Sequence, residues 1–260
     1  MIISLLKTIG KISITFLKVI GDVTLFTFNC FYFLSFKHLY FNKVVYQLFY
    51  IGFLSIPVIG LTCLFSGMVL AIQSFTGFSE YNAEDTVSKI VVLSITRELG
   101  PVLSGLMIAG RVGASIAAEI GTMKVTEQID ALKIMGKSPI QYLVIPRLIA
   151  GIVSMPFLVL LGNSIGILGG WIIAVTQLEL NSTMYLINTI ETLKFSDILQ
   201  GLVKASFFGF IVTLMGCYNG LKCSNGAQGV GKASTNSVVS ASILILISNY
   251  LITSIFFGNQ

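Results

Sequence analysis

The sequence has little charge for its length. Only 10% of its 260 residues are Asp, Glu, Lys or Arg, whereas 55% are hydrophobic and the mean hydropathy is +0.90. Because a soluble domain carries about 25% charged residues, much of this surface must face something other than water. The composition predicts a polytopic membrane protein. The basic residues behind the net charge of +5 lie between apolar spans, which favours a role in membrane orientation over nucleic-acid binding.

Histidine and paired cysteines are scarce as well. The single histidine, His38, excludes a His-based catalytic triad or a multi-His metal site in one copy of the chain. The four cysteines form no C-x-x-C pair, and three lie in apolar runs, which is typical of small buried hydrophobic residues. We therefore expect no metal site and no cofactor in this chain.

Long apolar runs, by contrast, are plentiful. Five of them are long enough to cross a hydrocarbon core about 30 Å thick, which takes about 20 helical residues; they lie near 46–73, 90–118, 142–175, 202–219 and 238–257. A run at 23–36 has only 14 residues, and lysines interrupt the first 22 residues, so this start favours an amphipathic helix on the membrane surface over a signal peptide. We expect an all-α protein with an interfacial region at 1–44 and a transmembrane domain at 45–260.

Basic and acidic loops alternate along the chain. Lysines gather in the N-terminal region and in the loops after the second and fourth spans, whereas the other two loops hold mainly acids. The positive-inside rule places the N-terminus inside and the C-terminus outside.

Small residues recur every four positions in three spans. Such ladders let helix backbones approach closely, within the chain or along a homodimer seam. They are Ala109, Gly113, Ala117 and Gly121; Gly162, Gly166 and Gly170; and Gly216 and Gly220.

The inside loop after the second span has its own helical pattern, in the stretch GRVGASIAAEIGTMKVTEQIDAL at 110–132. Thr122 has the chemistry of an N-cap, and Val125, Ile129 and Leu132 recur at helical spacing. Gly136 would end this short amphipathic helix. Because this helix is connected to a membrane span at each end, it could transmit movement from a cytoplasmic partner to both spans. The alternative is a solvated surface helix.

This stretch resembles the signature of the MlaE-type permeases, the membrane subunits of lipid-transporting ABC systems, which include plastid lipid permeases. LTCLFSGMVLAIQ at 61–73, TRELGPVLSGLMIAGRVGA at 96–114 and NGAQGVGKASTNSVVSASILI at 225–245 are similar to the same family. The resemblance implies a non-catalytic permease, a homodimer, that moves phospholipid, binds ABC ATPase subunits inside and docks an MCE-domain lipid-binding protein outside. It implies ATPase coupling by Glu119, Thr122, Glu127, Gln128, Asp130, Ala131 and Leu132.

One position departs from the family pattern, and two other classes of protein remain open. Asn249 stands where an acidic residue is expected in the last span. A secondary transporter would need internal repeats and midplane ionisable residues, and a membrane anchor would need no cavity. Usage rich in Ile, Phe, Lys and Asn, without a transit peptide, resembles a plastid genome and favours the plastid inner envelope membrane. A bacterial inner membrane is the alternative.

Two further motifs contain residue types that are found in binding sites. The segment 226–232, GAQGVGK, matches G-x-x-x-x-G-K, but Ala233 follows where a P-loop has Ser or Thr, and membrane spans flank it, so we expect no nucleotide there. Arg97 and Glu98 lie inside the second span, where an unpaired charge is costly. They predict either an interhelical pair, with Lys204, or the polar lining of a lipid cavity. Gly100 and Pro101 follow, and they predict a break or bend that would act as a hinge.

Overall fold

The computed structural model describes residues 2–33, 40–78 and 86–257, and these ranges contain helices and no strand. The predicted acidic loop at 79–85 and His38 lie outside them. A helix satisfies its backbone hydrogen bonds within one segment, which a bilayer core requires because it offers no water. The predicted all-α fold of a multi-pass membrane protein is confirmed.

Eleven α-helices are described in these ranges: α1 (Ile2–Phe33), α2 (Phe41–Ile51), α3 (Ile56–Phe78), α4 (Thr86–Ser94), α5 (Gly100–Ile108), α6 (Ala114–Val125), α7 (Gln128–Ile134), α8 (Ile145–Thr176), α9 (Ser182–Thr192), α10 (Phe195–Leu221) and α11 (Ala227–Phe257). Short helical turns of other pitch join some of them into longer rods. They are the 3₁₀ turn Phe53–Ser55 and the π-helical turns Ile95–Leu99, Ala109–Gly113 and Ile140–Val144.

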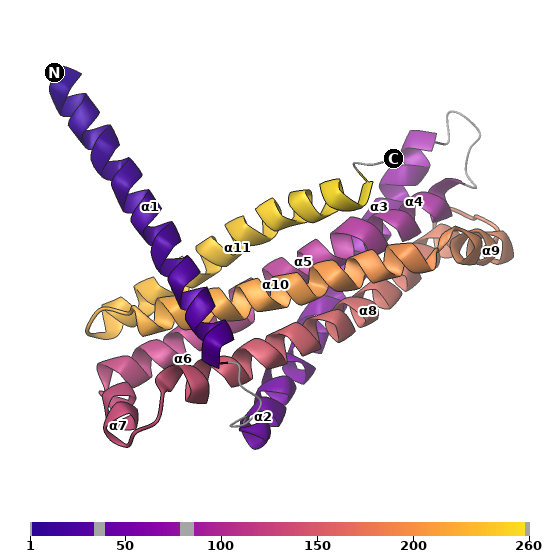
Figure 1. Cartoon of the computed structure of the whole chain (residues 1–260). Helices are drawn as coiled ribbons and strands as arrows, with labels where there is room; N and C mark the ends of the chain where they lie inside the picture. The colour runs from indigo at the N-terminus through magenta and orange to yellow at the C-terminus, as the bar shows by residue number, and fades with distance from the viewer. Residues whose placement is uncertain (1, 34–39, 79–85, 258–260) are drawn as a thin grey trace.

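The five predicted spans are all present. They correspond to the continuous helical segments Phe41–Phe78, Thr86–Val125, Ile140–Thr176, Phe195–Leu221 and Ala227–Phe256. A sixth segment, Ser13–Phe33 in α1, is also long and apolar enough to cross a membrane, and it is longer than the 14-residue run seen in the sequence. Figure 1 shows the N-terminal half of α1 standing away from the other helices. Its interfacial placement stays a prediction.

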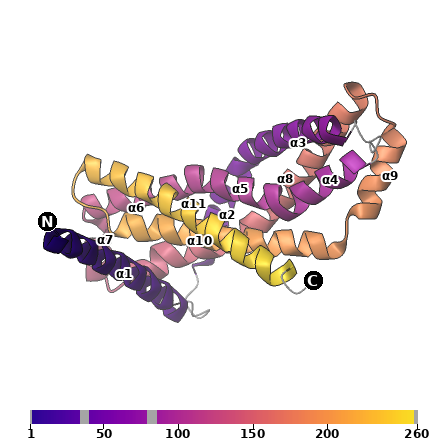
Figure 2. The same cartoon turned by 90° about the horizontal axis from the view of Figure 1, so that it is seen from above.

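The connections lie at two opposite ends of the bundle. Both views place α7 and the turn between α10 and α11 at one end, and α9 with the end of α11 at the other (Figures 1 and 2). This separation matches the alternation of basic and acidic loops, so we call the α7 end inside and the α9 end outside.

The small-residue ladders pack against other helices of the same chain. A Cβ at Gly166 would lie 3.1 Å from the Cys63 carbonyl oxygen of α3, and one at Gly216 would lie 3.1 Å from the Gly113 carbonyl oxygen. Gly121, at the end of the first ladder, faces Cys223. The ladders therefore hold helices together within the protomer, as the first reading of their pattern predicted.

Among the described glycines, the closest approach to the backbone of another helix is between α3 and α8. A Cβ at Gly67 would lie 1.9 Å from the carbonyl oxygen of Gly166, which is backbone and cannot turn aside. We expect Gly67→Ala to separate the two helices and to lower the free energy of unfolding by about 2 kcal/mol or more. Gly77→Ala is the matched control on the same helix, because a Cβ there meets nothing within 4 Å. Thermal unfolding of both variants in detergent measures the difference, and equal midpoints would contradict the prediction.

Candidate functional site

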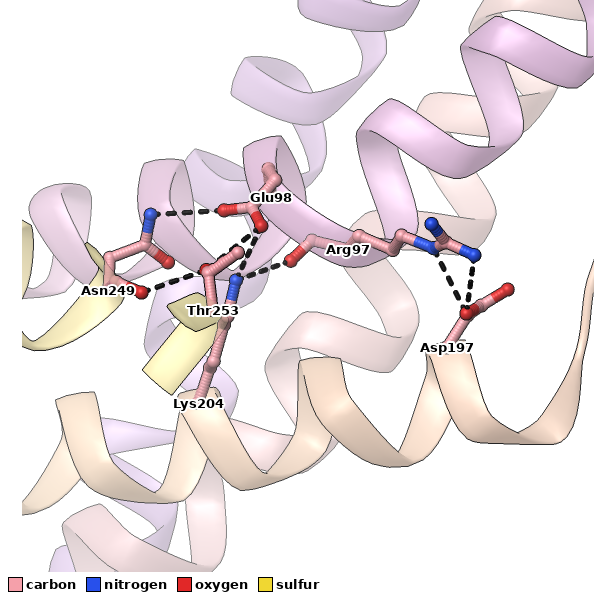
Figure 3. A network of polar contacts seen from close by, with 6 residues as sticks. All are labelled: Arg97, Glu98, Asp197, Lys204, Asn249 and Thr253. Carbon is pink, nitrogen blue, oxygen red and sulfur yellow. Dashed lines mark hydrogen bonds and ion pairs between the residues drawn. The ribbon is translucent and has the colours of Figure 1, made fainter. Parts of the chain in front are cut away.

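The charged residues of the second span lie in a π-helical turn, Ile95–Leu99, in which the N–H of Gly100 donates to the Ile95 carbonyl oxygen. Such turns are rare and often mark functional sites. The two charged side chains point to different partners on α10, as their adjacency in sequence predicts (Figure 3). Arg97 reaches Asp197 in the first turn of α10, and Glu98 reaches Lys204, seven residues further along that helix.

Hydrogen bonds join these groups to α11. Arg97 Nη2 lies 2.9 Å and its Nε 3.0 Å from Asp197 Oδ1. Lys204 Nζ donates to Glu98 Oε1 at 2.8 Å. From α11, Asn249 Nδ2 donates to Oε2 of that carboxylate at 3.0 Å, and Thr253 Oγ1 donates to Oε1 at 3.1 Å. The predicted pair of Glu98 with Lys204 is thus part of a network across three segments.

Burial divides this network into a closed and an open side. The side chains of Lys204 and Asp197 are 0% and 4% exposed, whereas those of Arg97 and Glu98 are 30% and 38% exposed. Two cations and two carboxylates balance, which limits the cost of burying them in a membrane. The open side presents the partly exposed Arg97 guanidinium beside the partly exposed Glu98 carboxylate. The network can therefore bind a polar group by hydrogen bonds without requiring net charge of either sign.

Of the break or bend predicted at Gly100 and Pro101, the break is not there. The segment Thr86–Val125 stays helical, and Gly100 has helical dihedral angles, φ −58° and ψ −56°. Pro101 lacks an N–H, so it cannot donate to the carbonyl of Arg97 four residues earlier. Lys204 Nζ donates to that oxygen instead, at 3.0 Å. A Cβ on Gly100 would lie 1.7 Å from Asn163 Oδ1, so this glycine allows α8 to approach. The hinge role stays a prediction.

Three members of the network were not predicted as partners. In the sequence, Asp197 counts among the acids of the loop before the fourth span, although its spacing of seven residues from Lys204 places both on one face of a helix. Asn249 was noted only as a departure, and Thr253 carried no signal. An acidic residue at 249 would place a second carboxylate beside Glu98, so the asparagine amide keeps the network neutral.

The predicted start of the coupling helix is wrong. Thr122 is not an N-cap, because α6 continues to Val125 and the Thr122 hydroxyl donates to the Ala118 carbonyl at 2.8 Å. The chain turns instead at Glu127, whose φ of +59° is left-handed and unfavourable for a residue other than glycine. The predicted end is right, since Gly136 has φ +72° and follows α7 closely.

α7 has one buried and one open face. Ile129 and Leu132 are buried in the main hydrophobic core, as their spacing predicted. Six predicted coupling residues are exposed: Glu119 and Thr122 on α6, and Glu127, Gln128, Asp130 and Ala131 at α7. Glu119 lies apart on α6, where it pairs with the buried Arg147 of α8 at 2.9 Å.

Two apolar side chains at the end of α7 are also open. Ile134 is 87% and Met135 63% exposed. Sequence reasoning missed both, because it assigned only polar residues to the open face of this helix.

The chain is similar to known permease proteins over most of its length. The family described as "Permease MlaE" matches residues 44–255. A "Probable ABC transporter permease protein" of Rickettsia felis is 52% identical over 99% of both chains. The "Intermembrane phospholipid transport system permease protein MlaE" of Haemophilus influenzae is 36% identical over 99% of both. "Protein TRIGALACTOSYLDIACYLGLYCEROL 1, chloroplastic" of Arabidopsis thaliana is 32% identical over 84% of this chain and 63% of its own length.

Proposed function

This chain belongs to the MlaE permease family, and from that premise we propose that it is the membrane-spanning permease subunit of an ABC transporter that moves phospholipid between membranes. One observation carries the proposal. The segment from Thr86 through α7 has the Arg97–Glu98 network towards its outside end and the exposed face of α7 at its inside end. The continuous helix Thr86–Val125, followed by the turn at Glu127, therefore joins the place where lipid would bind to α7, where an ATPase would bind.

The coupling step follows from how α7 is held. An ABC ATPase subunit binds the open face of α7, where carboxylates at 127 and 130 are followed by the exposed apolar Ile134 and Met135. Movement of α7 passes into the bundle through Ile129 and Leu132, because both pack in the same core as residues of α6 and α8. ATP is bound and hydrolysed by the partner, so this chain needs no cofactor of its own.

Two copies of the chain form the transporter. The open sides of Arg97 and Glu98 then line a cavity between the copies, and the phospholipid headgroup binds there by hydrogen bonds. An MCE-domain lipid-binding protein docks at the outside end. We place the complex in a bacterial inner membrane, which the 52% identity to the Rickettsia protein favours over a plastid envelope, for which the relative is 32% identical.

Purification of the tagged chain from its native membrane in a mild detergent tests this proposal. We expect mass spectrometry to find an ABC ATPase, an MCE-domain protein and extractable phospholipid with it. Crosslinking should give a dimer of the chain. A chain that comes out alone, under conditions that keep other membrane complexes together, would contradict the proposal.

A further inference from the structure

A cavity of about 620 Å³ lies between α1, α10 and α11. It is at the inside end of the protomer, where Figure 1 shows the turn between α10 and α11. Ligand sites have volumes of about 300–1,000 Å³, so this one has room for a headgroup and the start of its chains. Lys204 and Lys222 stand 18 residues apart along α10, which is about 27 Å at 1.5 Å per residue. The cavity is therefore distinct from the Arg97–Glu98 network at the outside end.

Its wall is divided into a polar and an apolar part. Lys222 and Ser224 follow the end of α10, and Lys232 and Asn236 lie in the first turns of α11. Further along the spans, the apolar side chains of Val19, Met215, Val239 and Ile243 line the cavity beside the polar Asn219 and Ser240. This division matches a phospholipid, whose charged headgroup lies at the membrane surface and whose chains enter the hydrocarbon.

The charge of the lining has one sign. Among the described residues that line the cavity, two are lysines and none is acidic. Lys222 Nζ donates to Asp22 of α1 and to the Tyr218 hydroxyl, which leaves one of its three donors. Lys232 is exposed on α11 and makes no ion pair among the described residues. Asp22 balances Lys222, so Lys232 is the lysine of this rim that has no counterion among the described residues, and its ammonium group is complementary to a phosphate.

The G-x-x-x-x-G-K segment supplies part of this wall, which accounts for a motif that has no nucleotide to bind. Gly229 and Lys232 both line the cavity. A Cβ at Gly229 would lie 2.1 Å from the Ser224 carbonyl oxygen, so a glycine is needed for the loop after α10 to close against α11. That close approach sets Lys222 and Lys232 on the same rim.

We propose that this cavity binds an anionic phospholipid of the inner leaflet, with Lys232 and Lys222 holding its phosphate and the apolar walls of α1, α10 and α11 holding its chains. The site belongs to the single protomer and needs neither an ATPase nor a transport cycle. Its failure would therefore leave the proposed transport function untouched.

Native mass spectrometry of the purified chain, titrated with phosphatidylglycerol or phosphatidylcholine, tests the proposal. We expect phosphatidylglycerol to be retained preferentially by the wild-type chain. One lysine near an anionic surface contributes about 1 kcal/mol, so Lys232→Gln should weaken this binding roughly fivefold. Asn236→Trp fills the cavity without changing its charge and should also reduce binding. Lys133→Gln removes the same charge from α7 at the same end, outside the cavity, and should leave binding unchanged.

Three results would overturn the proposal. Equal retention of the two lipids would mean that the rim does not select phosphate charge. Equal weakening by Lys133→Gln and Lys232→Gln would mean a diffuse attraction to the inside surface. Displacement of phosphatidylglycerol by millimolar inorganic phosphate would mean a free-anion site, whereas persistence of the lipid supports a site that also holds the chains.

Discussion

Replacing Lys204 by methionine should destabilise the protein more than any other single substitution in the charged network. The Lys204 side chain is fully buried and donates to both Glu98 Oε1 and the carbonyl of Arg97. Methionine keeps the volume but leaves the carboxylate without its cation and the carbonyl without a donor. Removing one partner of a buried ion pair costs about 3–5 kcal/mol. We expect a loss of that size in unfolding experiments in detergent and a lower yield of folded protein.

A double-mutant cycle separates the charge from the packing. Glu98→Gln combined with Lys204→Met removes both charges, and it should recover part of the stability that Lys204→Met alone loses. Lys89→Met, at an exposed lysine of α4, is the control and should change stability by no more than about 0.5 kcal/mol. If Lys204→Met unfolds like the wild type, or if the second substitution restores nothing, the pair is not what holds these helices together.

The second large effect is expected at α7. Glu127→Gly combined with Asp130→Asn removes two exposed carboxylates while the turn is kept, because glycine adopts the left-handed conformation of residue 127 without strain. If both carboxylates accept charge-assisted hydrogen bonds from the ATPase, each worth about 1.5–3 kcal/mol, affinity should fall tenfold or more. Pull-down of the ATPase and its activity in the reconstituted complex measure this loss.

The control for this experiment is Lys133→Gln. Asp130 pairs with Lys133 within α7, at 2.8 Å and with both side chains more than half exposed. Such a surface pair contributes about 0–1 kcal/mol. Lys133→Gln breaks the same pair but keeps both carboxylates. If it reduces ATPase binding as much as the double variant, the carboxylates act by stabilising α7 and make no contact of their own with the ATPase.

Hydropathy and isolated charges made the spans and the Glu98–Lys204 pair predictable, because both signals are local and strong. The partners on α10 and α11 were harder to predict from the sequence. Asn249 and Thr253 become relevant only once three helices are placed beside one another, and no spacing within one helix gives that placement. Asp197 is the exception, since its distance of seven residues from Lys204 repeats two helical turns.

The boundary of α7 shows why capping residues can mislead. A threonine hydroxyl can cap a helix, but it can equally donate to the carbonyl four residues earlier inside one, and Thr122 does the latter. The turn was made by Glu127, a residue type for which left-handed backbone is unfavourable and which sequence rules do not assign to that position. Sequence patterns predicted the amphipathic face of α7 correctly, but they placed the first residue of the helix incorrectly.

The order in which the chain is made gives the Glu98–Lys204 pair a further consequence. The two residues are 106 positions apart, so at about 5–20 residues per second the ribosome delivers the lysine roughly 5–20 s after the glutamate. During that interval the second span lies in the bilayer while the Glu98 carboxylate still lacks the cation that pairs with it. Assembly of the bundle is therefore completed only when α10 has been synthesised, and a nascent chain that stops before residue 204 leaves Glu98 as an uncompensated charge for membrane quality control to recognise.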